Sequence, residues 1–135
     1  MSGRARDWFR QAEADLIQAR DSHHDAHYEW ACFAAQQAAE KAAASACVAL
    51  GHRSRQSAVT PLLELVWSHS TSIDDALLDR ARALDKHHLQ TRYSKFFASG
   101  APTDFYTRAE AERAIADAAT VLEVCRRMLA RECVS

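Results

Sequence analysis

Apolar residues recur every three or four positions along most of the chain, and polar or charged residues fill the positions between them. Between Arg4 and about Ser22, the apolar positions are Trp8, Phe9, Ala12, Leu16 and Ala19. This spacing places them on one face of a helix, as in an amphipathic helix on the outside of a bundle. The first segment is therefore predicted to be an outer helix.

The stretch from Tyr28 to Leu50 is rich in alanine, the best helix former, and contains no Gly or Pro. It is predicted to be one long helix with a wide face of small side chains: Ala31, Cys32, Ala34, Ala35, Ala38, Ala39, Ala42, Ala46 and Ala49. Because small side chains let neighbouring backbones approach closely, we expect this helix to be the central and most buried one. Its polar interruptions, Gln36, Gln37, Glu40 and Lys41, either line a polar cleft or face solvent.

Turn and capping residues divide the middle of the chain. Gly51 is predicted to end the preceding helix, and Thr60-Pro61 is predicted to open a short helix with Thr60 as its N-cap. Ser72 and Asp75 resemble a capping box, and they are predicted to open a further helix. The apolar stripe of that helix is Ile73, Leu77, Ala81, Leu84 and His88.

The stretch from about Leu89 to Tyr106 has no sustained periodicity, and long loops of this kind in small domains are often functional. After it, Thr107 and Glu110 form a capping box that opens a last amphipathic helix. The chain is thus predicted to be a single domain, residues 1–135, of the all-α class. The expected architecture is an up-and-down antiparallel bundle of four long helices and one short helix.

Composition narrows the class without identifying a ligand. Apolar residues make up 48% and charged residues 26%, which is ordinary for a globular protein, and a net charge of −1 gives no global attraction to nucleic acid or membrane. No run approaches the ~20 apolar residues of a membrane span, and no leader pattern opens the chain. The cysteines at positions 32, 47, 125 and 133 lack the paired spacing of a zinc site, so we expect reduced thiols in a cytoplasmic protein. His23 and His27 have a spacing that could share a metal, but no third ligand is evident, and neither a metal nor a cofactor is predicted.

Residues 80–108 form a locally basic stretch. Between Arg80 and Arg108 there are six Lys or Arg residues against two acids, a local charge of +4 in a chain of −1. Arg92, Tyr93 and Lys95 lie in it beside His88, and this combination of cationic and aromatic side chains suits a phosphate-bearing ligand such as a nucleotide. Alternatively, Arg92 ties down the loop by binding backbone carbonyls, and the aromatic residues plug the end of the bundle.

Three segments carry a family resemblance. Residues 30–41 (WACFAAQQAAEK), residues 84–93 (LDKHHLQTRY) and the helix that opens at Tyr106-Thr107 together resemble the HEPN domain family, over nearly the whole chain. The resemblance implies a five-helix up-and-down bundle, frequent homodimers and nucleotide binding. It also implies a minimal nucleotidyltransferase as an encoded neighbour, in a pair of the toxin–antitoxin type. Two positions depart from the pattern, because Ser94 stands where Pro is expected and His87 or His88 where Tyr is expected.

Some branches of the family are metal-independent RNases that use an Arg followed by four to six residues and a His. Both Arg80 and Arg82 satisfy that count with His87. On a regular helix Arg82 and His87 point about 140° apart, whereas Arg80 and His87 are only about 20° from alignment. In such a reaction His87 would act as general base or acid, and an Arg would stabilise the phosphate.

Three hypotheses therefore stand after the sequence is read. The first is a nucleotide-binding or nucleotidyltransferase-partner module that uses Arg92, Tyr93, Lys95 and His88. The second is an RNase toxin that uses Arg80 or Arg82 with His87. The third is an interaction bundle without a ligand. A homodimer is expected in each case, since the central helix is apolar over more of its circumference than one monomer's neighbours need cover.

Overall fold

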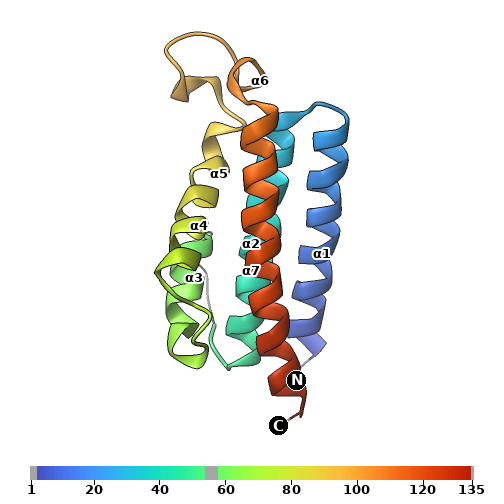
Figure 1. Ribbon diagram of the computed structural model, residues 1–135, viewed down its shortest axis with the longest axis vertical. Helices are drawn as coiled ribbons and strands as arrows, with labels where there is room; N and C mark the ends of the chain where they lie inside the picture. The colour runs from blue at the N-terminus through green and yellow to red at the C-terminus, as the bar shows by residue number, and fades with distance from the viewer. Residues whose placement is uncertain (1–2, 54–57, 135) are drawn as a thin grey trace.

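The structure is a computed structural model that describes residues 3–53 and 58–134, with side chains as far as residue 131. Every regular element in these residues is helical (Figure 1). The elements are α1 (Gly3–His24), α2 (Tyr28–Ala49), α3 (Val59–Val66), the 3-10 turn η1 (Trp67–His69), α4 (Asp75–Asp85), α5 (His87–Gln90), the 3-10 turn η2 (Ser94–Phe96), α6 (Pro102–Phe105) and α7 (Arg108–Val134).

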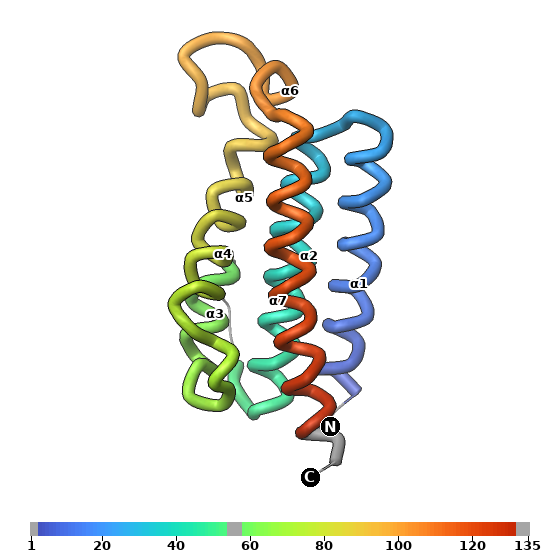
Figure 2. Tube along the Cα trace, viewed as in Figure 1, coloured from blue at the N-terminus to red at the C-terminus, as the bar shows by residue number. Residues whose placement is uncertain are grey.

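The long helices α1, α2, α4 and α7 run up and down side by side, with α2 packed between the others (Figure 2). Both ends of the described chain lie at one end of the bundle, and the connection from α5 to α7 stands above the other end. The predicted all-α, up-and-down bundle of four long helices and one short helix is therefore confirmed. The stretch predicted to lack periodicity holds only the single turns α5, η2 and α6.

Helix α2 is the most buried element, as its composition predicts. Twelve of its 22 residues are buried, against six of the 22 in α1. Trp30 is its only exposed residue, because α1, α3, α4, α5 and α7 cover the rest. The apolar surface of α2, from which a dimer was predicted, is thus buried mostly by the other helices of the same chain. The large apolar side chains that stay exposed elsewhere are Ile17, Leu65, Trp67, Leu89, Tyr93, Phe96 and Phe105.

The end of α2 follows the prediction for Gly51. This glycine has a φ of 84°, a left-handed conformation that side chains disfavour. Its N–H donates to the carbonyl of Val48 (3.1 Å), and the N–H of His52 donates to that of Cys47 (2.9 Å). These two bonds form a Schellman motif, which satisfies carbonyls that the helix itself leaves without a donor.

The predicted N-caps of α3 and α4 are each wrong by two residues. Helix α3 begins at Val59, and its N-cap Ala58 has no side-chain hydrogen bond, so Thr60 is not the cap. Helix α4 is capped by Asp74, whose carboxylate accepts from the N–H of Leu77 (2.9 Å), and not by Ser72. For α4 the nearby Asp74 offers a capping group like that of Ser72, and for α3 the N-cap Ala58 has no capping side chain at all. For α7, in contrast, Thr107 does accept from the N–H of Glu110 (3.1 Å).

Three cysteines, Cys32, Cys47 and Cys125, are free and buried in the core. Burial raises the pKa of the Cys32 thiol to about 12, that of Cys47 to about 11 and that of Cys125 to about 12. These thiols are therefore protonated at neutral pH and serve as core packing groups. Cys133 has no described side chain. None of the described helices is both long and apolar enough to cross a membrane.

Candidate functional site

A chain of polar side chains crosses the otherwise apolar helix α2. Gln36 is fully buried, and its carbonyl oxygen accepts from Nε2 of Gln37 (2.7 Å). Gln37 in turn donates to Glu40 (3.0 Å), and the amide nitrogen of Gln36 reaches Asp85 of α4 at 3.4 Å. Of the four polar residues of α2, Gln37 and Lys41 line an open groove, Gln36 is buried behind them and Glu40 is half-buried, so the polar-cleft alternative holds for two of the four. Burial raises the pKa of the Glu40 carboxyl above its usual value.

At its outer end this network reaches α1. Lys41 Nζ contacts Oδ2 of Asp15 at 2.6 Å, and both side chains are less than a quarter exposed. Lys41 also donates to the Gln37 carbonyl oxygen at 3.4 Å. A charge pair held between two helices and largely shielded from water is more strongly coupled than a surface pair. The pair fixes the position of α1 against α2 at the side of an open groove, which Asp15, Gln37 and Lys41 line together with Trp30 and Phe33.

Asp85 connects three helices at the end of α4. Its two carboxylate oxygens accept from the N–H groups of Val59 (2.8 Å) and Thr60 (3.0 Å) and from the Thr60 hydroxyl (2.7 Å). These donors open α3, so Asp85 supplies from another helix the cap that α3 lacks. The same carboxylate meets Gln36 of α2. This role was not predicted, since the acceptor stands 25 and 26 residues from its donors and leaves no local signal.

Arg92 lies just after α5, where two kinds of contact orient it. Its Nε donates to the backbone carbonyl of His88 (3.0 Å), as the structural alternative predicted. Its guanidinium also lies over the ring of Phe33, 4.4 Å from the centroid, and 5.2 Å from that of Tyr93. Within the described residues its two Nη groups have no hydrogen-bond partner, so the outer edge of the guanidinium remains available.

The predicted ligand residues gather around Arg92. His88 packs its ring against Phe33 (6.3 Å between centroids) and approaches the carbonyl oxygen of Gln36 at 3.5 Å. Tyr93 is 45% exposed, and Lys95 Nζ lies 5.9 Å from the centroid of its ring. Arg92, Tyr93, Lys95 and His88 therefore form one surface, which we call the basic loop surface.

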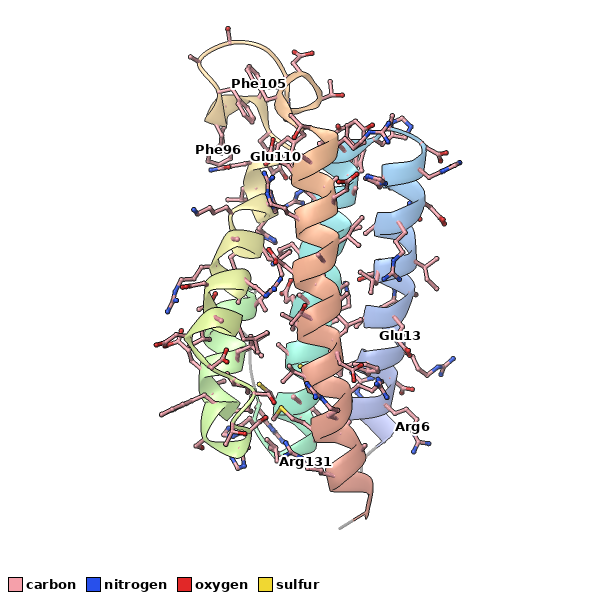
Figure 3. The ribbon with its side chains drawn as sticks, in the orientation of Figure 1. Arg6, Glu13, Phe96, Phe105, Glu110 and Arg131 are labelled. Atoms are coloured by element: carbon pink, nitrogen blue, oxygen red, sulfur yellow. The ribbon has the colours of Figure 1, made fainter. Side chains whose placement is uncertain are left out.

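The connection above the basic loop surface is held by aromatic packing. Phe97 and Phe105 stack at 4.6 Å between centroids with an interplanar angle of 2°. Phe105 lies in this connection above the end of the bundle, whereas Phe96 lies lower, level with Glu110 near the start of α7 (Figure 3). Gly100 takes a φ of 84° beside the Phe105 ring, where an added Cβ would lie only 3.0 Å from the ring edge. The aromatic residues of this stretch therefore fold the connection on itself, and Phe96 and Phe105 are nearly half exposed.

His87 faces α7 from the start of α5. Its Nδ1 lies 3.4 Å from the hydroxyl of Tyr106, and the two rings meet edge to face at 5.6 Å. Burial lowers the pKa of His87, although the carboxylates of Glu110 and Asp117 partly oppose the shift. Burial likewise raises the pKa of Tyr106 to about 12. At neutral pH this site therefore holds a neutral imidazole beside a neutral phenol.

Neither arginine of the predicted RNase pair contacts His87. Arg80 Nη1 binds Oδ1 of Asp117 on α7 at 2.7 Å, and Arg82 binds Asp79 on its own helix at 2.9 Å. Arg80 and His87 nevertheless face the same helix, and Asp117 acts electrostatically on His87. Arg82 and Asp79 are both more than half exposed. Arg80 and His87 thus point to the same side, as expected for a regular helix, although α4 ends at Asp85 and α5 begins at His87.

Ion pairs neutralise part of the positive charge of residues 80–108. Arg80 and Arg82 are paired with carboxylates that lie outside residues 80–108. The cations left without an acidic partner in the described structure are Lys86, Arg92, Lys95 and Arg108. None of these four lies in α4, and two of them, Arg92 and Lys95, belong to the basic loop surface. His23, from the candidate metal spacing, instead approaches Glu112 at 3.4 Å.

The geometry defines a class of all-α helical-bundle proteins with a polar network through the central helix and a basic surface at one end. Within that class, the chain belongs to the HEPN domain family, whose model matches residues 5–128. A solved structure from Thermus thermophilus is 36% identical, with a TM-score of 0.87 over 94% of this chain and 99% of that one.

Two further solved structures agree with this assignment. An archaeal HEPN homologue is 32% identical, with a TM-score of 0.77 over 93% of this chain and 97% of that one. A HEPN domain protein of Thermotoga maritima is also 32% identical, with a TM-score of 0.75 over 93% of this chain and 98% of that one. No curated protein matches the sequence.

Proposed function

We propose that this HEPN protein is a nucleotide-binding module whose basic loop surface contacts the phosphate. The observation that carries the proposal is the state of Arg92, whose guanidinium is oriented by the His88 carbonyl and the Phe33 ring while its Nη groups lack a partner among the described residues. An arginine already held in one orientation loses less side-chain entropy when it binds an anion. Its free edge offers the paired donors that suit phosphate oxygens.

The neighbours of Arg92 support the same ligand. Lys95 adds a second positive charge, with its Nζ 5.9 Å from the centroid of the Tyr93 ring. Tyr93 is exposed enough to contact a ligand held by either cation. His88 stands behind them and connects this surface to Gln36 in the core. Two cations beside an exposed aromatic ring favour a phosphate that carries a flat organic group over inorganic phosphate alone.

Calorimetric titration with ATP tests this proposal. Arg92→Ala should weaken binding by about 10- to 150-fold, which corresponds to the loss of one charge-assisted hydrogen bond worth about 1.5–3 kcal/mol. Arg10→Ala is the control, because Arg10 carries the same charge on the exposed side of α1 and pairs only with Asp7 in the described structure. Equal affinity of the Arg92 and Arg10 variants for ATP, with helicity retained in both, would show that Arg92 does not contact the phosphate and would contradict the proposal.

We also propose that the module works as a cytoplasmic homodimer beside a minimal nucleotidyltransferase, in a pair of the toxin–antitoxin type. The exposed large apolar side chains support an interface, and the buried reduced cysteines fit the compartment. Burial of about 800 Å² per chain is expected to give a dimer that persists at micromolar concentration. Sedimentation at several concentrations checks this, and a species of 15.1 kDa throughout contradicts it.

The alternative function is a metal-independent RNase that uses His87 with Arg80 or Arg82. The lowered pKa of His87 supports it, because a neutral imidazole can accept the proton of a ribose 2′-hydroxyl. Against it, each arginine is engaged by a carboxylate. Incubation with RNA in the presence of a chelator tests the alternative. Cleavage by the wild type that disappears in His87→Ala would favour the RNase, and no cleavage by either would exclude it.

A further inference from the structure

The groove between α1 and α2 lies next to the basic loop surface and has no part in the function proposed so far. Its volume is about 510 Å³. The residues that matter for its chemistry are Trp30, Phe33, Gln37 and Lys41 from α2 and Asp15 and Gln18 from α1. It therefore combines aromatic walls with amide and charged groups in one open cavity, and its size is in the range of small-molecule sites.

The aromatic wall is built from Trp30 and Phe33. Their rings meet edge to face at 6.0 Å and 78°, so each holds the other in place. Trp30 remains 50% exposed although it stands in the most buried helix of the protein. An exposed indole fixed at the side of a groove is a platform on which a flat ring can stack.

The opposite part of the groove presents fixed donors and acceptors. Lys41 uses two of its N–H groups on Asp15 and Gln37, which leaves a third for another acceptor. Gln18 donates to Ser22 through its amide nitrogen (3.0 Å), and its carbonyl oxygen has no partner in the described structure. A flat ring whose edge carries both acceptors and donors would satisfy Lys41 and Gln18 together. Nucleobases have this combination.

Phe33 joins the groove to the basic loop surface. Its ring lines the groove and also lies under the Arg92 guanidinium at 4.4 Å. The distance from the Trp30 ring to the Arg92 guanidinium is therefore no greater than the Trp30–Phe33 and Phe33–Arg92 distances added together. A single nucleotide can span such a separation, with its base on one side of Phe33 and its phosphate on the other.

We infer that the α1–α2 groove is a nucleobase subsite: the base stacks on Trp30 in the groove that Lys41 and Gln18 also line, and its phosphate extends past Phe33 to Arg92. The inference rests on the proposed phosphate contact at Arg92 and adds the recognition of the base. Because Trp30 and Arg92 contact different parts of the ligand, substitutions at these two positions act on different probes.

The test compares nucleoside 5′-monophosphates with ribose 5-phosphate, which has the same phosphate but no base. AMP, GMP, CMP and UMP are titrated by calorimetry into the wild type, Trp30→Ala and Arg92→Ala. Loss of one stacked base should weaken the best monophosphate by about 5- to 150-fold in Trp30→Ala. The affinity for ribose 5-phosphate should stay unchanged in that variant. Arg92→Ala should weaken both kinds of probe.

Trp67→Ala is the matched control, because Trp67 is 61% exposed in η1, outside the groove, and its removal should change neither affinity. If Trp30→Ala leaves the monophosphates unaffected while Arg92→Ala weakens them, the base subsite is wrong and the phosphate contact stands. An equal loss of ribose 5-phosphate affinity in Trp30→Ala also overturns the subsite. If the wild type binds no monophosphate and no ribose 5-phosphate, both proposals fail.

Discussion

Asp85 is expected to be the most costly polar side chain to remove, because its carboxylate receives three short hydrogen bonds that open α3. A hydrogen bond to a charged group contributes about 1.5–3 kcal/mol, and several bonds to one group are not additive. Removing the carboxylate in Asp85→Ala also leaves the buried amide of Gln36 without this partner. Water can replace part of the loss at this partly buried position. We therefore expect a loss of about 3–5 kcal/mol in unfolding free energy.

Urea denaturation followed by circular dichroism measures this loss as a shift of the midpoint at constant slope. Asp85→Asn should lose less, about 1–3 kcal/mol, because it keeps one acceptor oxygen but turns an amide toward the donors. Asp79→Ala is the control on the same helix. It removes an exposed pair with Arg82 and should cost no more than about 0.5 kcal/mol. If Asp85→Ala costs no more than Asp79→Ala, the cap on α3 does not stabilise the fold.

Three further outcomes follow from the titrating groups. Because folding lowers the pKa of His87, the unfolded chain takes up a proton below about 6.5 that the folded chain resists. The unfolding free energy should therefore decrease as the pH is lowered below about 6.5. His87→Gln should make the unfolding free energy depend less on pH in this range. Glu40 has the opposite effect on the pH dependence of stability. Because its pKa is raised in the folded state, the folded state loses stability as the pH rises above about 4.5. Glu40→Gln should therefore gain stability over the wild type at pH 7 but not at pH 4, as urea midpoints will show. Cys32 and Cys125, with pKa values of about 12, should react with a thiol reagent only when the protein unfolds.

The helices that the sequence predicted best are those whose signals are local. The alanine content of α2, the glycine at position 51 and the Thr107 cap all act within a few residues, and each is found where it was expected. The pairs that build the polar network are different. Lys41 meets Asp15 across 26 residues and Gln36 meets Asp85 across 49, so no periodicity along the chain could reveal them.

Of the candidate site, the residues around Arg92 were predicted from the sequence and the full groove was not. The residues around Arg92 are neighbours in sequence, and the structure does bring them together. The sequence also offered both roles for Arg92, and the structure shows the carbonyl contact beside a guanidinium edge that has no hydrogen-bond partner among the described residues. A polar cleft beside Gln37 and Lys41 was one alternative, but its other wall could not be predicted, because Asp15 and Gln18 belong to another helix. Only the packing of α1 on α2 turns these residues into one cavity.

The alanines of α2 also limit how the protein can change in evolution. Ala35, Ala38, Ala39 and Ala42 have no exposed surface, and a larger side chain at any of them would force neighbouring helices apart. New sequence is accommodated far more easily in surface connections than in a packed interior. We therefore expect homologues to differ in the length of the α5–α7 connection, while the spacing of their helices stays the same. Homologues would then diverge by lengthening one end of the molecule while the width of the helical bundle stays constant.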